Sequence, residues 1–286
     1  MDWLSTAPDR ASLLTMQPDD PKRREIIIKR ATSADKTEDM RKRYLETGET
    51  KPQMPRRFCY LNYHFADKEE VKEYLSELIP DWEGSEDADV LRRTFRTLVH
   101  EKRVHGINKI VCIGIGTLVH DIDDDDLEEF ELGFRVDVRC CLQHVAANFL
   151  AAVLREQSPN GPVRVYAVDY AYNLDDKEIL NDMGIEVLPH EHGNYESYVR
   201  IDKDTLVMSI GTGGGIYQVI CETTQPAAMI WTWFNASIPR NGEDLSVVRK
   251  VLREEYEVVD CPPLSVRDAE EAFAPLSEST LFVRAK

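Results

Sequence analysis

Gly114-Ile115-Gly116 is the first stretch whose residue types and position could bind a ligand. It follows the apolar segment "KIVCI" at 109–113, which is typical of a buried strand. Glycines at the end of a strand permit a tight turn and let the backbone approach a phosphate, a carboxylate or a sulfonium amino acid. Val119 stands where the dinucleotide fingerprint has its third glycine. Two interpretations therefore stay open, a ligand-binding turn and a plain strand-to-helix turn.

A second turn, Gly211-Thr212-Gly213-Gly214, follows the apolar segment "DTLVMSI" at 204–210. Four of the five residues from 211 to 215 are glycine, and successive backbone N–H groups in such a turn can form an anion-binding nest. The Lys-Ser or Lys-Thr pair of a phosphate-binding P-loop is missing. Four glycines in one turn lower the stability of the fold unless a ligand must approach the backbone closely. We therefore expect this turn to face a ligand.

Asp169 is the last residue of the predicted strand "VRVYAVD" at 163–169, and Tyr170 follows it. An acidic side chain at this place commonly accepts hydrogen bonds from ribose hydroxyls in nicotinamide and S-adenosylmethionine proteins. Residues 116 and 169 lie 53 positions apart, against about 20 in the usual fingerprint. The alternative is that Asp169 caps the next helix, but Asp175 and Asp176 fit that role better. We therefore expect Asp169, with Tyr170, to contact the ligand.

The run Asp123–Asp126 lies in a segment of some twenty residues between the first turn and the next helix, which is expected to begin at about Val138. The acidic run therefore belongs to an inserted loop that can lie away from the glycines. The segment does not fit an EF-hand calcium loop, which needs glycine at its sixth position and glutamate at its twelfth. Counted from Asp121, these positions hold Asp126 and Leu132. We expect a solvated loop, with residues 121–129 available to a protein partner, and we predict no metal site.

The elements that would hold these turns alternate between apolar strands and amphipathic helices. Strands are expected at 109–115, 163–169, 185–189, 204–210, 227–235, 256–263 and 279–286, and helices at 138–156, 175–184, 215–224 and 243–255. Continuously apolar strands indicate a mostly parallel sheet covered on both faces. Right-handed crossovers then give an α/β, Rossmann-like three-layer sandwich. An antiparallel strand at the C-terminal edge would favour a methyltransferase-like sheet.

A strand is also expected at 56–65, followed by two helices at 66–79 and 87–105. Residues 1–55 show little periodicity, so we predict a partly ordered N-terminal extension there. Residues 56–286 are predicted to form one domain with an α/β N-terminal part and a Rossmann-like core at 106–286. Of two further residues, His144 could face the ligand crevice or cap the core, and Trp231 could stack on a base or pack in the core.

The composition limits the classes of partner. The net charge is −17, from 52 acidic and 35 basic residues, which disfavours non-specific binding to nucleic acid or to an anionic membrane. Six cysteines form no CxxC pair, so we expect buried reduced thiols. The N-terminus has neither the basic nor the apolar region of a secretory signal. We therefore predict an acidic cytoplasmic or nuclear protein without a nucleic-acid or membrane partner.

Several segments together resemble the sensitivity-to-red-light-reduced (SRR-like) domain family. The matching segments are "IVCIGIGTL", "RCCLQHVAANFLAAVL", "VYAVDYAYNLDDKEILNDMGIEVL", "TLVMSIGTGGGIYQVI" and "AAMIWTWFN", within about residues 105–235. The chain differs from the family where Tyr170 follows the acid, since relatives tend to have proline there. It also has Gly211-Thr212-Gly213 where relatives often carry Pro-His-Cys, so a role of that His or Cys would be lost.

The resemblance implies a regulatory or signalling protein, in a family associated with circadian or stress regulation and with no firmly assigned chemistry. A protein partner would then bind the loop 121–129 or the N-terminal extension, and the pocket would take a small nucleotide-like ligand. The alternative is a methyltransferase-like enzyme that uses S-adenosylmethionine or NAD(P), since methyl transfer can need little more than positioning. Fold alone does not decide between them, so catalytic activity stays open.

Overall fold

A seven-stranded sheet forms the centre of the computed structural model, which describes residues 9–34, 68–104, 106–118, 138–156, 161–189, 195–210, 214–232, 245–261 and 279–285. The strand order is β3-β2-β1-β4-β5-β7-β6. Only β7 runs antiparallel to its neighbours among these strands. The strands are β1 Lys109–Ile113, β2 Arg164–Val168, β3 Ile185–Val187, β4 Thr205–Ser209, β5 Ala228–Thr232, β6 Tyr256–Val259 and β7 Ser279–Arg284.

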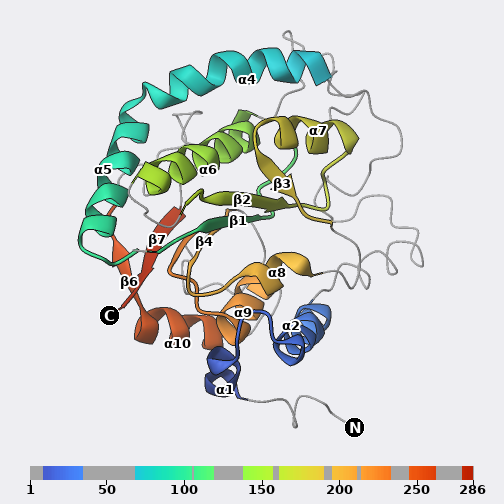
Figure 1. Cartoon of the computed structure of the whole chain (residues 1–286), viewed down its shortest axis with the longest axis vertical. Coiled ribbons are helices and arrows are strands. Elements are labelled where there is room, and N and C mark those ends of the chain that lie inside the picture. Colours follow the sequence, from blue (N-terminus) through green and yellow to red (C-terminus); the bar gives the residue numbers. More distant parts are fainter. Residues whose placement is uncertain are drawn as a thin grey trace.

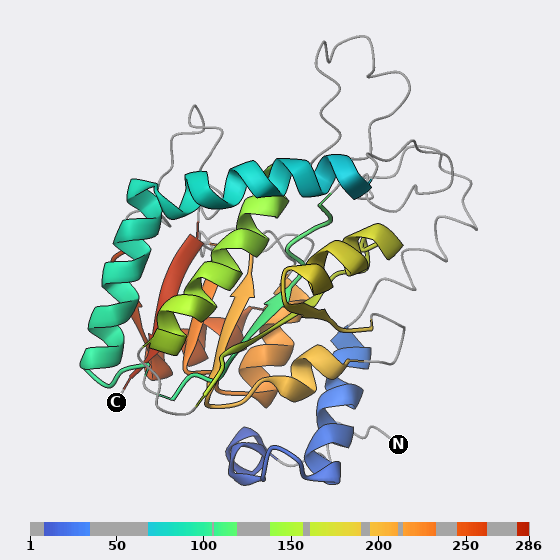
Figure 2. The same ribbon diagram turned by 45° about the horizontal axis from the view of Figure 1, so that its top comes forward.

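Helices cover both faces of the sheet and make three layers (Figures 1 and 2). One face carries α4 Lys68–Glu83, α5 Glu86–His100, α6 Val138–Glu156 and α7 Leu174–Asp182. The other carries α1 Arg10–Thr15, α2 Pro21–Ala34, α8 Glu196–Arg200, α9 Gly214–Thr223 and α10 Ser246–Glu255. The predicted mostly parallel α/β sandwich with an antiparallel C-terminal edge is confirmed.

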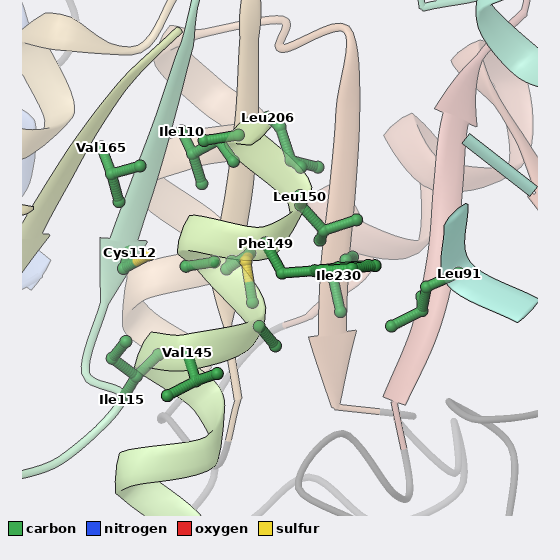
Figure 3. Packing of buried hydrophobic residues seen from close by; sticks show 14 of the residues in the cluster. Leu91, Ile110, Cys112, Ile115, Val145, Phe149, Leu150, Val165, Leu206 and Ile230 are labelled. Atoms are coloured by element: carbon green, nitrogen blue, oxygen red, sulfur yellow. The ribbon is translucent and has the colours of Figure 1, made fainter. Parts of the chain in front are cut away.

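The larger core lies between the sheet and α6. Figure 3 shows Val145 and Phe149 of α6 in one buried cluster with Cys112 of β1 and Ile230 of β5. Every residue of β4 is buried, and so are the last four of β1, in agreement with the mostly apolar sequences of both strands. Burial of such side chains, at about 25 cal/mol per Å² of apolar surface, provides the main stabilisation of these layers.

The second core lies on the opposite face and contains Trp231, which is fully buried. Its ring lies 4.5 Å from that of Tyr217 on α9, centroid to centroid. The Tyr217 hydroxyl donates a 3.0 Å hydrogen bond to the carbonyl of Ser209 at the end of β4. Of the two roles predicted for Trp231, the structure therefore shows packing in the core.

The N-terminal part differs in detail from the sequence-based expectations. Residues 9–34 include α1 and α2, which pack on the second core, whereas 35–67 lie outside the described residues. The predicted helix at 87–105 ends at His100, because the N–H groups of Arg103 and Val104 both turn back to the carbonyl of Leu98. The described residues contain no helix that is long and apolar enough to span a membrane.

Five thiols test the packing of both cores, since the described cysteines at 112, 140, 141, 221 and 261 form no disulfide and are buried. Burial raises the pKa of Cys112 and of Cys221 to about 12, and that of Cys261 to about 11. A thiolate is the reactive form, so we expect these five residues to resist iodoacetamide at pH 8 until the protein is unfolded. Mass spectrometry of native and denatured samples would measure this, and rapid native labelling of Cys112 would contradict the packing.

Candidate functional site

The sheet has a switch point between β1 and β4, where ligands bind in open α/β folds. Strand β1 pairs in parallel with β2 on one side and with β4 on the other. After β1 the next helix is α6 on one face, whereas after β4 it is α9 on the other face (Figure 2). The predicted turn Gly114–Gly116 follows β1 and therefore lies at the edge where β4 also ends.

The ends of β1 and β4 are bonded to each other at this edge. The Ser209 hydroxyl donates a 3.1 Å hydrogen bond to the carbonyl of Ile113. Gly214 is the first residue of α9, and Gly211, Thr212 and Gly213 lie outside the described residues. The acidic loop predicted at 121–129 also lies outside them.

Gly114 and Gly116 both adopt left-handed backbone conformations, with φ of 66° and 85°. Residues with a Cβ rarely adopt such angles, so the turn requires glycine at these two places. The side chain of Ile115 between them is 1% exposed and lies in the α6-side core near Val145 (Figure 3). A ligand at this edge could therefore meet the backbone of Ile115 but not its side chain.

Asp169 holds this glycine turn from the neighbouring strand. Its Oδ2 accepts a 2.8 Å hydrogen bond from the N–H of Gly116, and its Oδ1 accepts one of 2.9 Å from the N–H of Ala171. The side chain is buried, with 6% of the residue exposed. The structure thus brings Asp169 and Gly116 into direct contact with each other, while the ribose contact stays a prediction.

A second carboxylate, that of Asp176, holds the residues after the turn. It accepts hydrogen bonds from the Thr117 hydroxyl at 2.6 Å, the N–H of Leu118 at 3.1 Å and the N–H of Asn173 at 3.0 Å. Burial raises the pKa of Asp176, although these three donors act in the opposite direction. Two acids from one segment, Asp169 and Asp176, therefore fix the backbone from 116 to 118.

The prediction that Asp175 or Asp176 caps α7 is wrong, because Asn173 is the N-cap. The Asn173 side chain accepts a hydrogen bond from the N–H of Asp176, which returns one to the N–H of Asn173. The Asn-x-x-Asp spacing at 173–176 resembles a capping box and could have shown this in the sequence. Asp176 sits at the third helical position, where its carboxylate also reaches the glycine turn.

His144 and Tyr172 form a buried pair beneath the same edge. The Nδ1 of His144 lies 2.6 Å from the carbonyl of Cys140, which can only accept, so Nδ1 carries the proton. Its Nε2 lies 2.7 Å from the Tyr172 hydroxyl, which is then the donor. Burial, followed by the nearby Asp169 carboxylate, raises the pKa of Tyr172 well above its ordinary value. His144 therefore belongs to the core, and sequence analysis did not identify Tyr172.

Two large side chains are exposed near the end of β2. Tyr170 is 37% exposed, directly after Asp169, and Leu174 at the start of α7 is 76% exposed. The expected contact of Tyr170 with a ligand stays a prediction. Within the described parts of the chain, no group of three or more His, Cys, Asp or Glu residues could hold a metal ion.

Comparisons place this architecture among known proteins. A family model described as SRR1 domain matches residues 83–282. Similar solved structures include a fibrillarin/Nop5p complex, at 14% identity and a TM-score of 0.29 over 63% of this chain and 72% of that one. They also include the Methanococcus jannaschii fibrillarin pre-rRNA processing protein, at 12% identity and a TM-score of 0.31 over 64% of this chain and 67% of that one. With TM-scores this low, neither structure bears on function. Curated proteins give no match.

Removal of the Asp176 carboxylate tests how the turn is held. We expect Asp176→Ala to lower the free energy of unfolding by about 2–4 kcal/mol, because buried N–H groups at Leu118 and Asn173 lose their acceptor. Asp175→Ala in the same helical turn is the matched control and should cost less than about 1 kcal/mol. Urea unfolding of both variants measures this, and equal losses would contradict the assignment.

Proposed function

The chain belongs to the SRR1 domain family, and we propose that it is a regulatory protein that binds a small adenosyl-type ligand at the edge between β1 and β4. The observation that carries the proposal is the turn Gly114–Gly116, left-handed at both glycines and located at the switch point of the sheet. Strand ends at a switch point leave space for a ligand, and glycines let it approach the backbone.

The hydrogen bonds of the turn favour an adenosyl compound over a dinucleotide. The N–H of Gly114 donates to the carbonyl of Val168, and the N–H of Gly116 donates to Asp169, so both serve the protein itself. These amides are the groups that would hold a pyrophosphate in a dinucleotide site. The carboxylates of Asp169 and Asp176 behind the turn also repel phosphate and attract a positive charge. A sulfonium compound such as S-adenosylmethionine has that charge and lacks phosphate.

The buried ionisable groups support a binding role ahead of a catalytic one. Asp169 and Asp176 accept hydrogen bonds from the backbone, and His144 and Tyr172 are bonded to each other. Groups used in this way fix a conformation and are poorly placed to exchange protons with a substrate. A bound ligand would then act as a signal that changes how the protein meets its partners.

A methyltransferase is the second candidate, because β7 lies antiparallel between β5 and β6. This is the sheet arrangement that favours a methyltransferase-like protein, and methyl transfer depends mainly on positioning. Under both candidates the same adenosyl ligand would occupy the edge. The proposal also includes a protein partner at residues 121–129 or at the N-terminal segment, action in the cytoplasm or nucleus, and a role in circadian or stress regulation.

Ligand binding can be measured by thermal shift with S-adenosylmethionine, S-adenosylhomocysteine, NAD⁺ and ATP. A ligand at roughly 100 times its Kd adds about 2.7 kcal/mol, which raises the Tm of a chain of this size by about 5 °C or more. We expect this shift with the two adenosyl compounds and a much smaller one with NAD⁺ and ATP.

The exposed Tyr170 allows a site test that leaves the fold intact. Tyr170→Ala should reduce the affinity for S-adenosylhomocysteine about ten-fold, whereas Val258→Ala, at an exposed position of the edge strand β6, should leave it unchanged. Isothermal titration calorimetry of both variants gives the comparison. This site would be refuted if neither adenosyl compound raised the Tm. Equal affinity of the wild-type protein and Tyr170→Ala for S-adenosylhomocysteine would also refute it.

A further inference from the structure

Helices α1 and α2, called here the N-terminal strap (residues 10–34), lie outside the family-matched residues 83–282 but pack on the domain. Figures 1 and 2 show both helices beside α9, and α2 also lies against α8. Ile27 of α2 is fully buried and Ala31 is 2% exposed, both within the second core. The strap therefore covers an apolar surface that the matched domain itself does not cover.

Two arginines of the strap bind the ends of the helices beneath it. Arg10 donates from Nε to the carbonyl of Cys221, in the last turn of α9, at 2.5 Å, and from Nη2 to Glu255 at 2.8 Å. Arg23, 4% exposed, donates from Nη2 to the carbonyl of Ile201 after α8 at 2.9 Å. Carbonyls at helix C-termini lack partners within their own helix and favour a nearby cation. Arg10 provides such a cation at the C-terminus of α9, and Arg23 provides one at the C-terminus of α8.

The charges of the strap and of the covered surface are opposite. Helix α2 contains five basic residues and one acidic residue in a chain whose net charge is −17. Arg24 pairs with Glu196 of α8 at 2.7 Å, and Arg30 lies 3.5 Å from Glu222 of α9. A basic amphipathic helix is thus the shape and charge that this surface, called here the α8–α9 face, accepts.

The strap buries few hydrophobic side chains for its length. Within the described residues 9–34, its buried hydrophobic side chains are only Leu13, Ile26, Ile27 and Ala31. The backbone hydrogen bonds described for this segment outside its helices join strap residues to one another, so its opening breaks no strand pairing. Segments with few buried contacts open locally while the rest of a protein stays folded.

We propose that the α8–α9 face is a docking surface for a basic amphipathic helix of a partner protein, and that the strap fills it within the same chain until the partner displaces it. The partner helix would place an arginine and, four positions later, an isoleucine in the face, with basic residues against its acidic rim. Arg23, Ile27 and Arg30 of the strap occupy these positions now. Release of the strap exposes this face without unfolding the sheet.

The test uses the full chain and a fluorescent peptide with the sequence of residues 9–34. Ile27→Asp changes the strap and leaves α8 and α9 untouched, so it should open the strap and raise the affinity for the peptide at least ten-fold over the wild-type chain. Lys22→Asp places the same acid on an exposed position of α2 and should bind the peptide as weakly as wild type. Fluorescence anisotropy measures the three affinities.

Charge reversal and salt test the electrostatic part of docking, and a scrambled peptide separates docking from general charge attraction. Adding Glu196→Lys and Glu222→Lys to Ile27→Asp should cancel the gain, and so should an increase from about 0.1 M to about 1 M salt, which shortens the screening length from about 10 Å to about 3 Å. A scrambled peptide of the same composition should not bind. Binding of the scrambled peptide with equal affinity would overturn the docking surface.

The remaining outcomes also decide the proposal. Equal peptide affinity of Ile27→Asp and wild type would overturn it, because an open strap must leave the face free. Loss of cooperative unfolding and of near-ultraviolet circular dichroism in Ile27→Asp would overturn it too, since the strap would then be a permanent part of the core. A folded variant with stronger, salt-sensitive peptide binding supports it.

Discussion

The edge of the sheet at the end of β1 depends on one hydrogen bond between the segments that follow neighbouring strands, from the N–H of Gly116 to the carboxylate of Asp169. Gly114 and Gly116 have left-handed backbone conformations, which glycine adopts about as readily as right-handed ones. A contact from outside the turn is therefore needed to select the left-handed conformation. Asp169 provides that contact from the end of β2, and its second oxygen holds Ala171. Asp176 then continues the same support over the next two residues.

This arrangement limits what the edge can bind. A turn whose two glycine amides already have acceptors, with two carboxylates behind it, is a poor phosphate site and a better site for a neutral or cationic group. His144 and Tyr172 are buried together below it, as the acceptor and the donor of one hydrogen bond. The edge is therefore preorganised, and its chemistry is set by backbone and charge more than by exposed reactive side chains.

The sheet and its helices could be predicted because continuous apolar runs and helical periodicity are local properties. The strand "DTLVMSI" and the helix 138–156 appear in the structure close to their predicted limits. The contact of Asp169 with Gly116 could not be predicted, because it joins residues 53 positions apart through the register of β1 and β2. The bonds of Arg10 and Arg23 to α9 and α8 likewise join residues more than 170 positions apart. Composition alone gave no sign of them.

The central claim is that Asp169 holds the glycine turn, and amide hydrogen exchange of Gly116, resolved by NMR, tests it most directly. A hydrogen-bonded, buried amide exchanges only when the structure around it opens. The account predicts that the Gly116 amide is protected about as strongly as that of Cys112 in β1. Exchange of Gly116 at the rate of an unprotected amide, while Cys112 stays protected, would contradict it.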